Sequence, residues 1–278
     1  MNRQELVEQI NKKRNYLCIG LDTDIALLPK HLQKHQNAVF EFNKAIIDAT
    51  KNFCVGYKIN TAFYESMGIK GWEALEQTVH YIPSTHFKIA DAKRGDIGNT
   101  SSHYAKTFFE VYPFDAVTVA PYMGEDSLRP FLEYQNKWTI VLGLTSNKGS
   151  KDFQQLMVSK EETSELKDSR QYLYQKVMHQ IAGWGTPNNL MFVVGATKPE
   201  QLEEIRSNFP EHFFLVPGVG FQGGSLKEVS MAGLKNDGGI LVNASRAIIY
   251  AGNSESFADD ARKISIEYND EMKLYLKD

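Results

Sequence analysis

Short apolar runs alternate with longer amphipathic stretches along the whole chain. Eight runs of strand length occur at residues 16–21, 53–59, 87–90, 116–120, 138–144, 190–194, 213–216 and 239–243. Helical spacing of apolar positions occurs at residues 37–51, 71–81, 99–111, 125–134, about 164–182, from Thr197 onward, and 254–276. A polar loop fills residues 147–164, and no linker interrupts the pattern. Eight strand–helix units in this length predict one α/β domain, a (β/α)8 TIM barrel spanning residues 1–278.

Composition narrows the class of protein. The 278 residues are 42% hydrophobic and 23% charged, with a net charge of −3, which is ordinary for a soluble globular chain. This balance gives no broad basic surface for nucleic acid. The N-terminus lacks the apolar core of a secretory signal, and no apolar run is long enough to span a bilayer. Cys18 and Cys54 lie inside apolar runs, which predicts buried, reduced thiols and a cytoplasmic location.

The most concentrated charge is the stretch Asp91-Ala92-Lys93-Arg94-Gly95-Asp96, directly after the third apolar run. Asp91 and Lys93 are two residues apart, so in an extended chain their side chains leave on the same face. Asp96 follows beyond a glycine that lets the backbone turn. Charged groups held together shift one another's pKa values and can move protons at neutral pH. The alternative interpretation of this stretch alone is a solvated, charged turn between a strand and a helix.

Other polar residues follow the predicted strands. The sites of TIM barrels lie at the C-terminal ends of the strands, where this chain has Asp22, Lys58 and Asn60, Thr145-Ser146-Asn147, Pro217, and Asn243-Ala244-Ser245-Arg246. Each has a purely structural alternative: Asp22 and Ser146 as turn formers, Lys58 as a solvated rim lysine, and Arg246 as the partner of a helix C-terminus. Together they predict a polar site at one mouth.

The loop after the seventh strand is rich in glycine. Gly218, Gly220 and Gly223 formally fit the dinucleotide fingerprint GxGxxG. That fingerprint belongs to a first strand–helix turn, and no ribose-binding carboxylate follows near Asn243. The favoured interpretation is a phosphate site built from the loops after strands seven and eight, with Arg246 adding a bidentate charge.

Taken together, DAKRGDIGNT, Lys58, the PGVGFQGG loop and NASRAI resemble the orotidine 5′-phosphate decarboxylase family, in particular its longer-chain branch. The resemblance spans residues 22–246. It implies decarboxylation of orotidine 5′-phosphate to uridine 5′-phosphate, the last step of de novo UMP synthesis, without a metal or organic cofactor. It also implies a homodimer whose two active sites are shared. One departure is that Ser245 and Ala247 flank Arg246 where shorter relatives often have a glycine.

The same resemblance implies roles for single residues. Lys58, Asp91, Lys93 and Asp96 form the catalytic charged tetrad, with Asp96 contributed across the dimer interface. Lys93 protonates C6 of the pyrimidine, and Asp91 lies beside the departing carboxylate. The remaining implied contacts are Asp22, Lys58, Asp96 and Thr100 to the ribose, Ser146 to the base, Gln222 to base and phosphate, Pro217 to the substrate, and Gly223, Gly224, Ser245 and Arg246 to the phosphate.

The residue types suit this chemistry. Loss of carbon dioxide leaves negative charge on a ring carbon, and an ammonium aimed at that carbon stabilises the charge and donates the proton. The sequence leaves open whether Asp91 repels the substrate carboxylate or positions Lys93. Two rival functions remain: a metal-dependent sugar-phosphate decarboxylase or aldolase on the same barrel, and a non-catalytic nucleotide- or phosphate-binding barrel. In the first, an acidic metal ligand would stand where this chain has Lys58.

Overall fold

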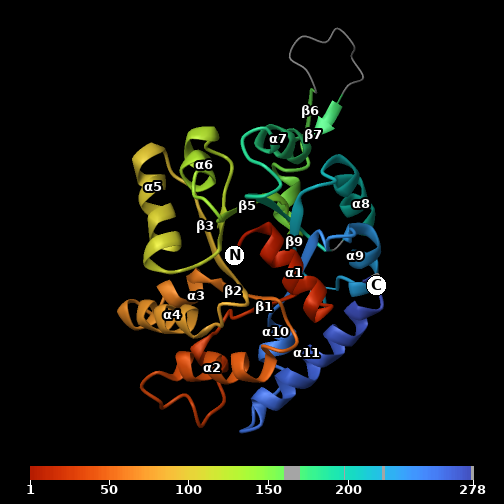
Figure 1. Ribbon diagram of the computed structural model, residues 1–278. Coiled ribbons are helices and arrows are strands. Elements are labelled where there is room, and N and C mark those ends of the chain that lie inside the picture. The colour runs from red at the N-terminus through yellow and green to blue at the C-terminus, as the bar shows by residue number, and fades with distance from the viewer. Residues whose placement is uncertain (160–169, 197, 221–222, 277–278) are drawn as a thin grey trace.

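The computed structural model describes residues 1–159, 170–196, 198–220 and 223–276 (Figure 1). Within them, eight parallel strands close into a barrel in the order β1-β10-β9-β8-β5-β4-β3-β2. These strands are β1 (Leu17–Gly20), β2 (Gly56–Asn60), β3 (Phe87–Arg94), β4 (Ala116–Val119), β5 (Trp138–Leu144), β8 (Leu190–Val194), β9 (Phe213–Pro217) and β10 (Ile240–Ala244). The predicted (β/α)8 barrel is therefore confirmed.

Helices surround the barrel, as Figure 1 shows. They are α1 (Arg3–Lys13), α2 (Ala38–Thr50), α3 (Thr61–Glu65), α4 (Ile69–Tyr81), α5 (Gly98–Lys106), α6 (Glu125–Leu132), α7 (Leu173–Ala182), α8 (Pro199–Asn208), α9 (Leu226–Gly233), α10 (Arg246–Ile249) and α11 (Phe257–Lys273). The predicted helix at 99–111 is α5 continued by a π-helical turn, η2 (Thr107–Val111). Short 3-10 turns form at η1 (Ile25–Leu27) and η3 (Lys148–Lys151). Within the described residues, no helix has the length and apolar character needed to cross a bilayer.

Alternation along the strands divides the core into two layers. Val117 and Val119 of β4 point outward and pack under the helices, whereas Ala116 points into the barrel. The inner layer holds large rings: Trp138 packs edge-on against Phe87 and Phe213, with ring centroids 6.1 and 6.0 Å away.

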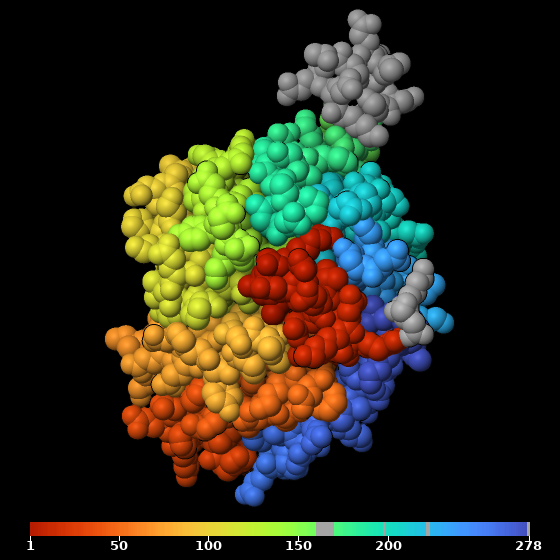
Figure 2. Space-filling model, in the orientation of Figure 1, coloured from red at the N-terminus to blue at the C-terminus, as the bar shows by residue number. Residues whose placement is uncertain are grey.

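Helix α1 closes the N-terminal end of the barrel. Its Leu6 and Ile10 are fully buried in the inner layer. Two contacts hold the preceding Met1 in place. Its amino group pairs with Asp115 at 2.5 Å, and its carbonyl accepts the Trp138 indole N–H at 3.0 Å. In Figure 2, α1 crosses the centre of this face. Any cavity inside the barrel must therefore open at the opposite, C-terminal end.

The segment after β5 differs from the prediction of a polar loop followed by a helix from about residue 164. The chain forms the turn η3 and then a strand β6 (Met157–Ser159), which pairs antiparallel with β7 (Arg170–Tyr172). Helix α7 begins only at Leu173. Residues 170–172 are extended because their backbone groups pair with β6, so that part of the helix prediction is wrong, and residues 160–169 lie outside the described residues.

Candidate active site

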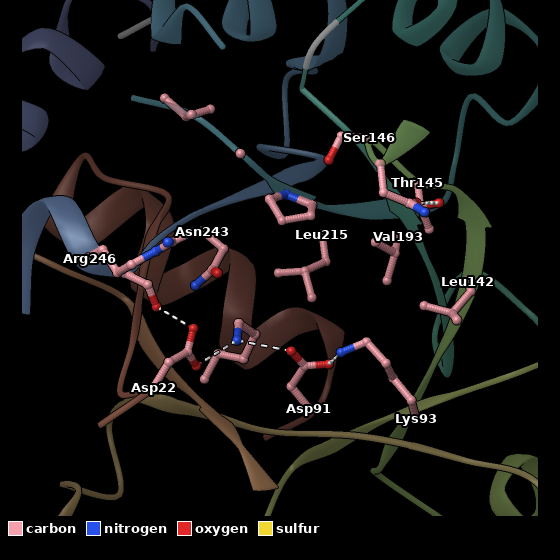
Figure 3. Close-up of a pocket in the computed structure, with 16 residues that line it drawn as sticks. Asp22, Asp91, Lys93, Leu142, Thr145, Ser146, Val193, Leu215, Asn243 and Arg246 are labelled. Atoms are coloured by element: carbon pink, nitrogen blue, oxygen red, sulfur yellow. Dashed lines mark hydrogen bonds and ion pairs between the residues drawn. The ribbon is translucent and has the colours of Figure 1, made fainter. Parts of the chain in front are cut away.

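A cavity of about 330 Å³ opens at the C-terminal ends of the barrel strands (Figure 3). Eight of the residues predicted from the sequence line it: Asp22, Lys58, Asp91, Lys93, Ser146, Pro217, Ser245 and Arg246. Thr145, Asn147 and Asn243, which the sequence also places at strand ends, line it as well, and the other lining residues are Leu142, Val193, Leu215, Gly218 and Val219. Residues from strands far apart in the sequence thus meet at one mouth, as the barrel geometry predicts.

Asp22, just after β1, and the charged residues of β2 and β3 form a row of alternating sign. Lys58 Nζ lies 3.1 Å from Asp22 Oδ1 and 3.0 Å from Asp91 Oδ2. The other carboxylate oxygen of Asp91 contacts Lys93 Nζ at 2.6 Å. The side chain of Lys58 is only 5% exposed, whereas that of Lys93 is 48% exposed, so Lys93 is the cation at the open end of the row.

These contacts keep Lys58 and Asp91 charged. Burial alone would lower the pKa of Lys58, but Asp22 and Asp91 outweigh burial and raise it above its ordinary value. Burial alone would raise the pKa of Asp91, but Lys58 and then Lys93 outweigh it, so this pKa lies far below its ordinary value. The contribution of Asp91 to stability is present above its unfolded pKa of about 4, and that of Lys58 below its unfolded pKa of about 10.4. Both are therefore in place around neutral pH.

The backbone at Lys93 is not the plain extended strand that the alternation predicts. The pairing of β3 with β4 shifts register between Ala90 and Arg94, and Lys93 has a left-handed φ of 48°. The hydroxyl of Thr118 supports this bulge: it accepts the Lys93 N–H at 3.0 Å and donates to Asp91 Oδ1 at 3.0 Å. Thr118 was not among the predicted site residues, although a polar residue within the apolar run 116–120 was a signal.

The end of the cavity opposite Lys93 is polar and carries Arg246. Ser245 Oγ donates to Asp22 Oδ2 at 2.6 Å, and Asn243 Nδ2 donates to the Cys18 carbonyl at 2.9 Å. Figure 3 shows Asp22, Asp91 and Lys93 along one side of the cavity and Ser146 on the other, with Leu215 and Val193 between them. An apolar floor between two polar walls suits a flat ring that carries polar substituents.

The glycine-rich loop follows β9 and is tightly turned. Gly218, Gly220 and Gly223 have φ values of 100°, 78° and 87°, which favour glycine. The Gly223 N–H donates to the Gly220 carbonyl at 2.9 Å, and the Gly224 N–H to the Gly218 carbonyl at 3.1 Å. Both donors are thus used inside the loop, and neither Gly223 nor Gly224 lines the cavity. Their predicted phosphate contacts stay predictions. Gln222 lies outside the described residues.

Asp96 and Thr100 are not brought into the cavity of their own barrel. Asp96 lies between β3 and α5, where its Oδ1 accepts the Ile97 N–H at 2.8 Å, and Thr100 lies in the first turn of α5. The Thr100 N–H donates to the Ile97 carbonyl at 3.2 Å. Asp96 and Thr100 are therefore separated from the eight predicted site residues that line the cavity.

Comparisons with known proteins point in one direction. Residues 15–261 match the family described as "Orotidine 5′-phosphate decarboxylase / HUMPS family". The orotidine 5′-phosphate decarboxylase of Phocaeicola vulgatus is 54% identical over 274 residues, covering 96% of this chain and 97% of that protein. That of Bacteroides fragilis is 52% identical over 280 residues, covering 100% and 99%. Among solved structures, the OMP decarboxylase of Leishmania donovani aligns with a TM-score of 0.80 and 35% identity, over 99% of both chains.

Proposed function

Because this chain belongs to the orotidine 5′-phosphate decarboxylase / HUMPS family, we propose that Lys93 is the proton donor of the reaction in its pocket. The chain is a carboxy-lyase that converts orotidine 5′-phosphate to uridine 5′-phosphate and carbon dioxide. The observation that carries the Lys93 assignment is its place in the charged row: it is the exposed terminal cation, and Asp91 holds it at 2.6 Å.

The chemistry follows from that placement. When the bond between C6 and the carboxyl group breaks, its electron pair stays on C6 and carbon dioxide leaves. An N–H of the Lys93 ammonium then transfers its proton to C6, and the lysine becomes neutral. A fixed cation beside C6 stabilises the negative charge as it develops, without any reorganisation at the moment of reaction.

Asp91 is proposed to position Lys93 beside the departing carboxylate. Both of its carboxylate oxygens are engaged, one by Lys58 and the other by Lys93 and Thr118. This pairing compensates the charge of Lys93 and fixes the direction of its ammonium group. Fixed geometry of the reacting groups can account for a large share of a rate enhancement.

The remaining cavity residues are proposed to bind the rest of the nucleotide. Ser146 would face the pyrimidine across the apolar floor, while Asp22 and Lys58 would hold the ribose. Arg246 and Ser245, which line the cavity, would bind the phosphate, and Gly223, Gly224, Gln222 and Pro217 would complete the contacts. Phosphate binding far from C6 offers energy that can be used in the transition state.

A metal-dependent sugar-phosphate reaction on the same barrel is the rival function. It would need an acidic metal ligand at the end of strand two, where this chain has the buried cation Lys58 between Asp22 and Asp91. A cation at this position repels a metal ion. The relatives at 52–54% identity are named as orotidine 5′-phosphate decarboxylases. We therefore favour a reaction that needs neither a metal nor an organic cofactor.

We further propose that two copies of the chain form a dimer with shared sites. Asp96 and Thr100 do not line the cavity of their own barrel. Near them, Ile97 and Tyr122 are 59% and 92% exposed. The two loops that carry these residues are neighbours, because the Ala120 N–H donates to the Arg94 carbonyl at 2.8 Å. Exposed apolar residues near a predicted site residue that does not line its own cavity suit an interface between two copies.

The buried thiols Cys18 and Cys54 suit a reducing compartment such as the cytoplasm.

Replacing Lys93 tests the proton-donor assignment. Lys93→Ala should fold and bind uridine 5′-phosphate but lose decarboxylation by many orders of magnitude, measured from the ultraviolet change as the substrate is consumed. Lys88→Ala is the matched control, because Lys88 lies on the same strand but donates to the Val79 carbonyl at 2.9 Å, away from the cavity. A Lys93→Ala enzyme within about tenfold of the parent, a barrier change of only ~1.4 kcal/mol, would refute the assignment.

A further inference from the structure

The end of β5 leaves a backbone N–H that the barrel does not pair. The register between β5 and β8 shifts between Leu142 and Leu144, and beyond it the Leu144 carbonyl accepts the Gly195 N–H at 2.8 Å. The next amide, that of Thr145, donates to the side chain of Gln154 at 2.8 Å. A side-chain amide from the segment after β5 thus takes the place of a neighbouring strand.

Gln154 makes a second bond to the same residue. Its Nε2 donates to Thr145 Oγ1 at 2.9 Å, and Thr145 Oγ1 donates onward to Asn147 Oδ1 at 2.5 Å. Residues Thr145 and Asn147, the two neighbours of Ser146, are therefore tied into one chain of hydrogen bonds. The carboxamide of Gln154 supplies both the acceptor for the N–H and the donor for the hydroxyl.

Gln154 is itself held firmly. The backbone carbonyl of Gln154 accepts the Tyr174 N–H of α7 at 2.9 Å. Two residues later, the backbone carbonyl of Leu156 accepts the Leu173 N–H at 2.8 Å. From the other side, Ser146 is packed against Gly195, where an added Cβ would lie 2.9 Å from the Ser146 Cβ. Ser146 is thus confined between a glycine of the barrel and a segment that Gln154 fixes.

We propose that Gln154 is a positioning residue for the pyrimidine subsite. It holds the Thr145–Asn147 segment so that Ser146 stays on the cavity wall opposite Asp91 and Lys93, where Figure 3 shows it. The segment after β5 that carries Gln154 is therefore part of the substrate-binding apparatus and sets how tightly the pyrimidine is held. This inference rests on the proposed contact between Ser146 and the base.

Binding of two ligands tests the inference. Uridine 5′-phosphate carries the base, whereas ribose 5-phosphate lacks it, so their affinities separate the pyrimidine subsite from the rest of the cavity. In Gln154→Met, the affinity for uridine 5′-phosphate should fall roughly tenfold, on the scale of one or two hydrogen bonds, while that for ribose 5-phosphate stays unchanged. The KM for orotidine 5′-phosphate should rise in parallel. Gln154→Glu retains the acceptor for the Thr145 N–H and should lose less.

Two further variants make the outcome decisive. Gln155→Met is the matched control: Gln155 is also half-buried, but its side-chain amide donates to Ser150 Oγ at 2.9 Å and makes no bond to Thr145 or Asn147 among the described residues, so both affinities should stay unchanged. Ser146→Ala should lose the same base-dependent affinity, and adding Gln154→Met to it should cost little more. If Ser146→Ala weakens uridine 5′-phosphate binding but Gln154→Met does not, or if Gln154→Met weakens both ligands equally, the positioning role is wrong while the Ser146 contact stands. If Ser146→Ala binds uridine 5′-phosphate like the parent, the Ser146 contact fails and the inference fails with it.

Discussion

At the scale of single residues, the arrangement of the charged groups depends on the hydroxyl of Thr118, which contacts both Lys93 and Asp91. Asp22, Lys58, Asp91 and Lys93 follow strand ends that meet at one mouth of the barrel, so the sequence could predict them. Thr118 was not predicted, because its role as a hydrogen-bond partner depends on the bulge in β3, and no local sequence pattern predicts that bulge. The hydroxyl matters only because Lys93 and Asp91 of the neighbouring strand lie within 3.0 Å of it.

Thr118→Val tests that role. Valine has nearly the same shape but leaves the Lys93 N–H without its acceptor and Asp91 Oδ1 without one donor. We expect a loss of ~1–3 kcal/mol in the free energy of unfolding. We also expect a lower kcat with little change in KM, because the Lys93 ammonium loses its fixed direction. Chemical denaturation and steady-state kinetics measure the two effects.

The neighbouring strand offers a matched control. Thr139 of β5 is also fully buried, but its Oγ1 has no hydrogen-bond partner among the described residues. Thr139→Val removes a buried polar group that is unsatisfied there, so it should be neutral or stabilising and leave kcat unchanged. Equal effects of the two substitutions would show that the Thr118 hydroxyl has no special role.

At the scale of elements, short continuous apolar runs predicted all eight barrel strands to within a few residues, because both faces of these strands are buried. Elements with weaker patterns were missed. Helix α1 carried a readable signal, a capping box in which Asn2 and Glu5 bond to each other's backbone N–H at 3.0 and 2.7 Å. The antiparallel pair of β6 and β7 carried no such sequence signal, because its residues are exposed or half-buried and its strands are joined by backbone pairing.

Ile10→Ala tests α1 as the plug of the barrel. Ile10 is fully buried in the inner layer, so the truncation should destabilise the fold by ~2–5 kcal/mol. The active site lies at the other end of the barrel, so kcat at a temperature where the protein is folded should not change. Glu8→Ala on the exposed face of α1 should alter stability by less than ~0.5 kcal/mol. A stable Ile10→Ala protein, or one with a reduced kcat in its folded form, would contradict this account.

At the scale of the whole molecule, the structure separates two groups of residues that the motif places together. Asp91 and Lys93 enter the cavity, whereas Asp96, only three residues beyond Lys93, does not line it. The family resemblance could predict the four charged residues but not this separation. The direction of the backbone after Gly95 depends on the bulge in β3 and on the contact with the segment at Ala120. A site that one chain leaves incomplete is explained if a second chain completes it.

Mixing two inactive variants tests the shared site. Lys93→Ala and Asp96→Ala are each expected to be inactive as homodimers. After subunit exchange, a two-fold dimer that swaps Asp96 has one mouth with both lesions and one with neither, so activity should reappear in the heterodimer. Lys93→Ala mixed with Lys58→Ala is the control, because both lysines line the cavity of their own barrel and every mouth keeps a lesion. If exchange is verified by differently tagged chains and the first mixture stays as inactive as the control, Asp96 serves its own barrel and the sites are not shared.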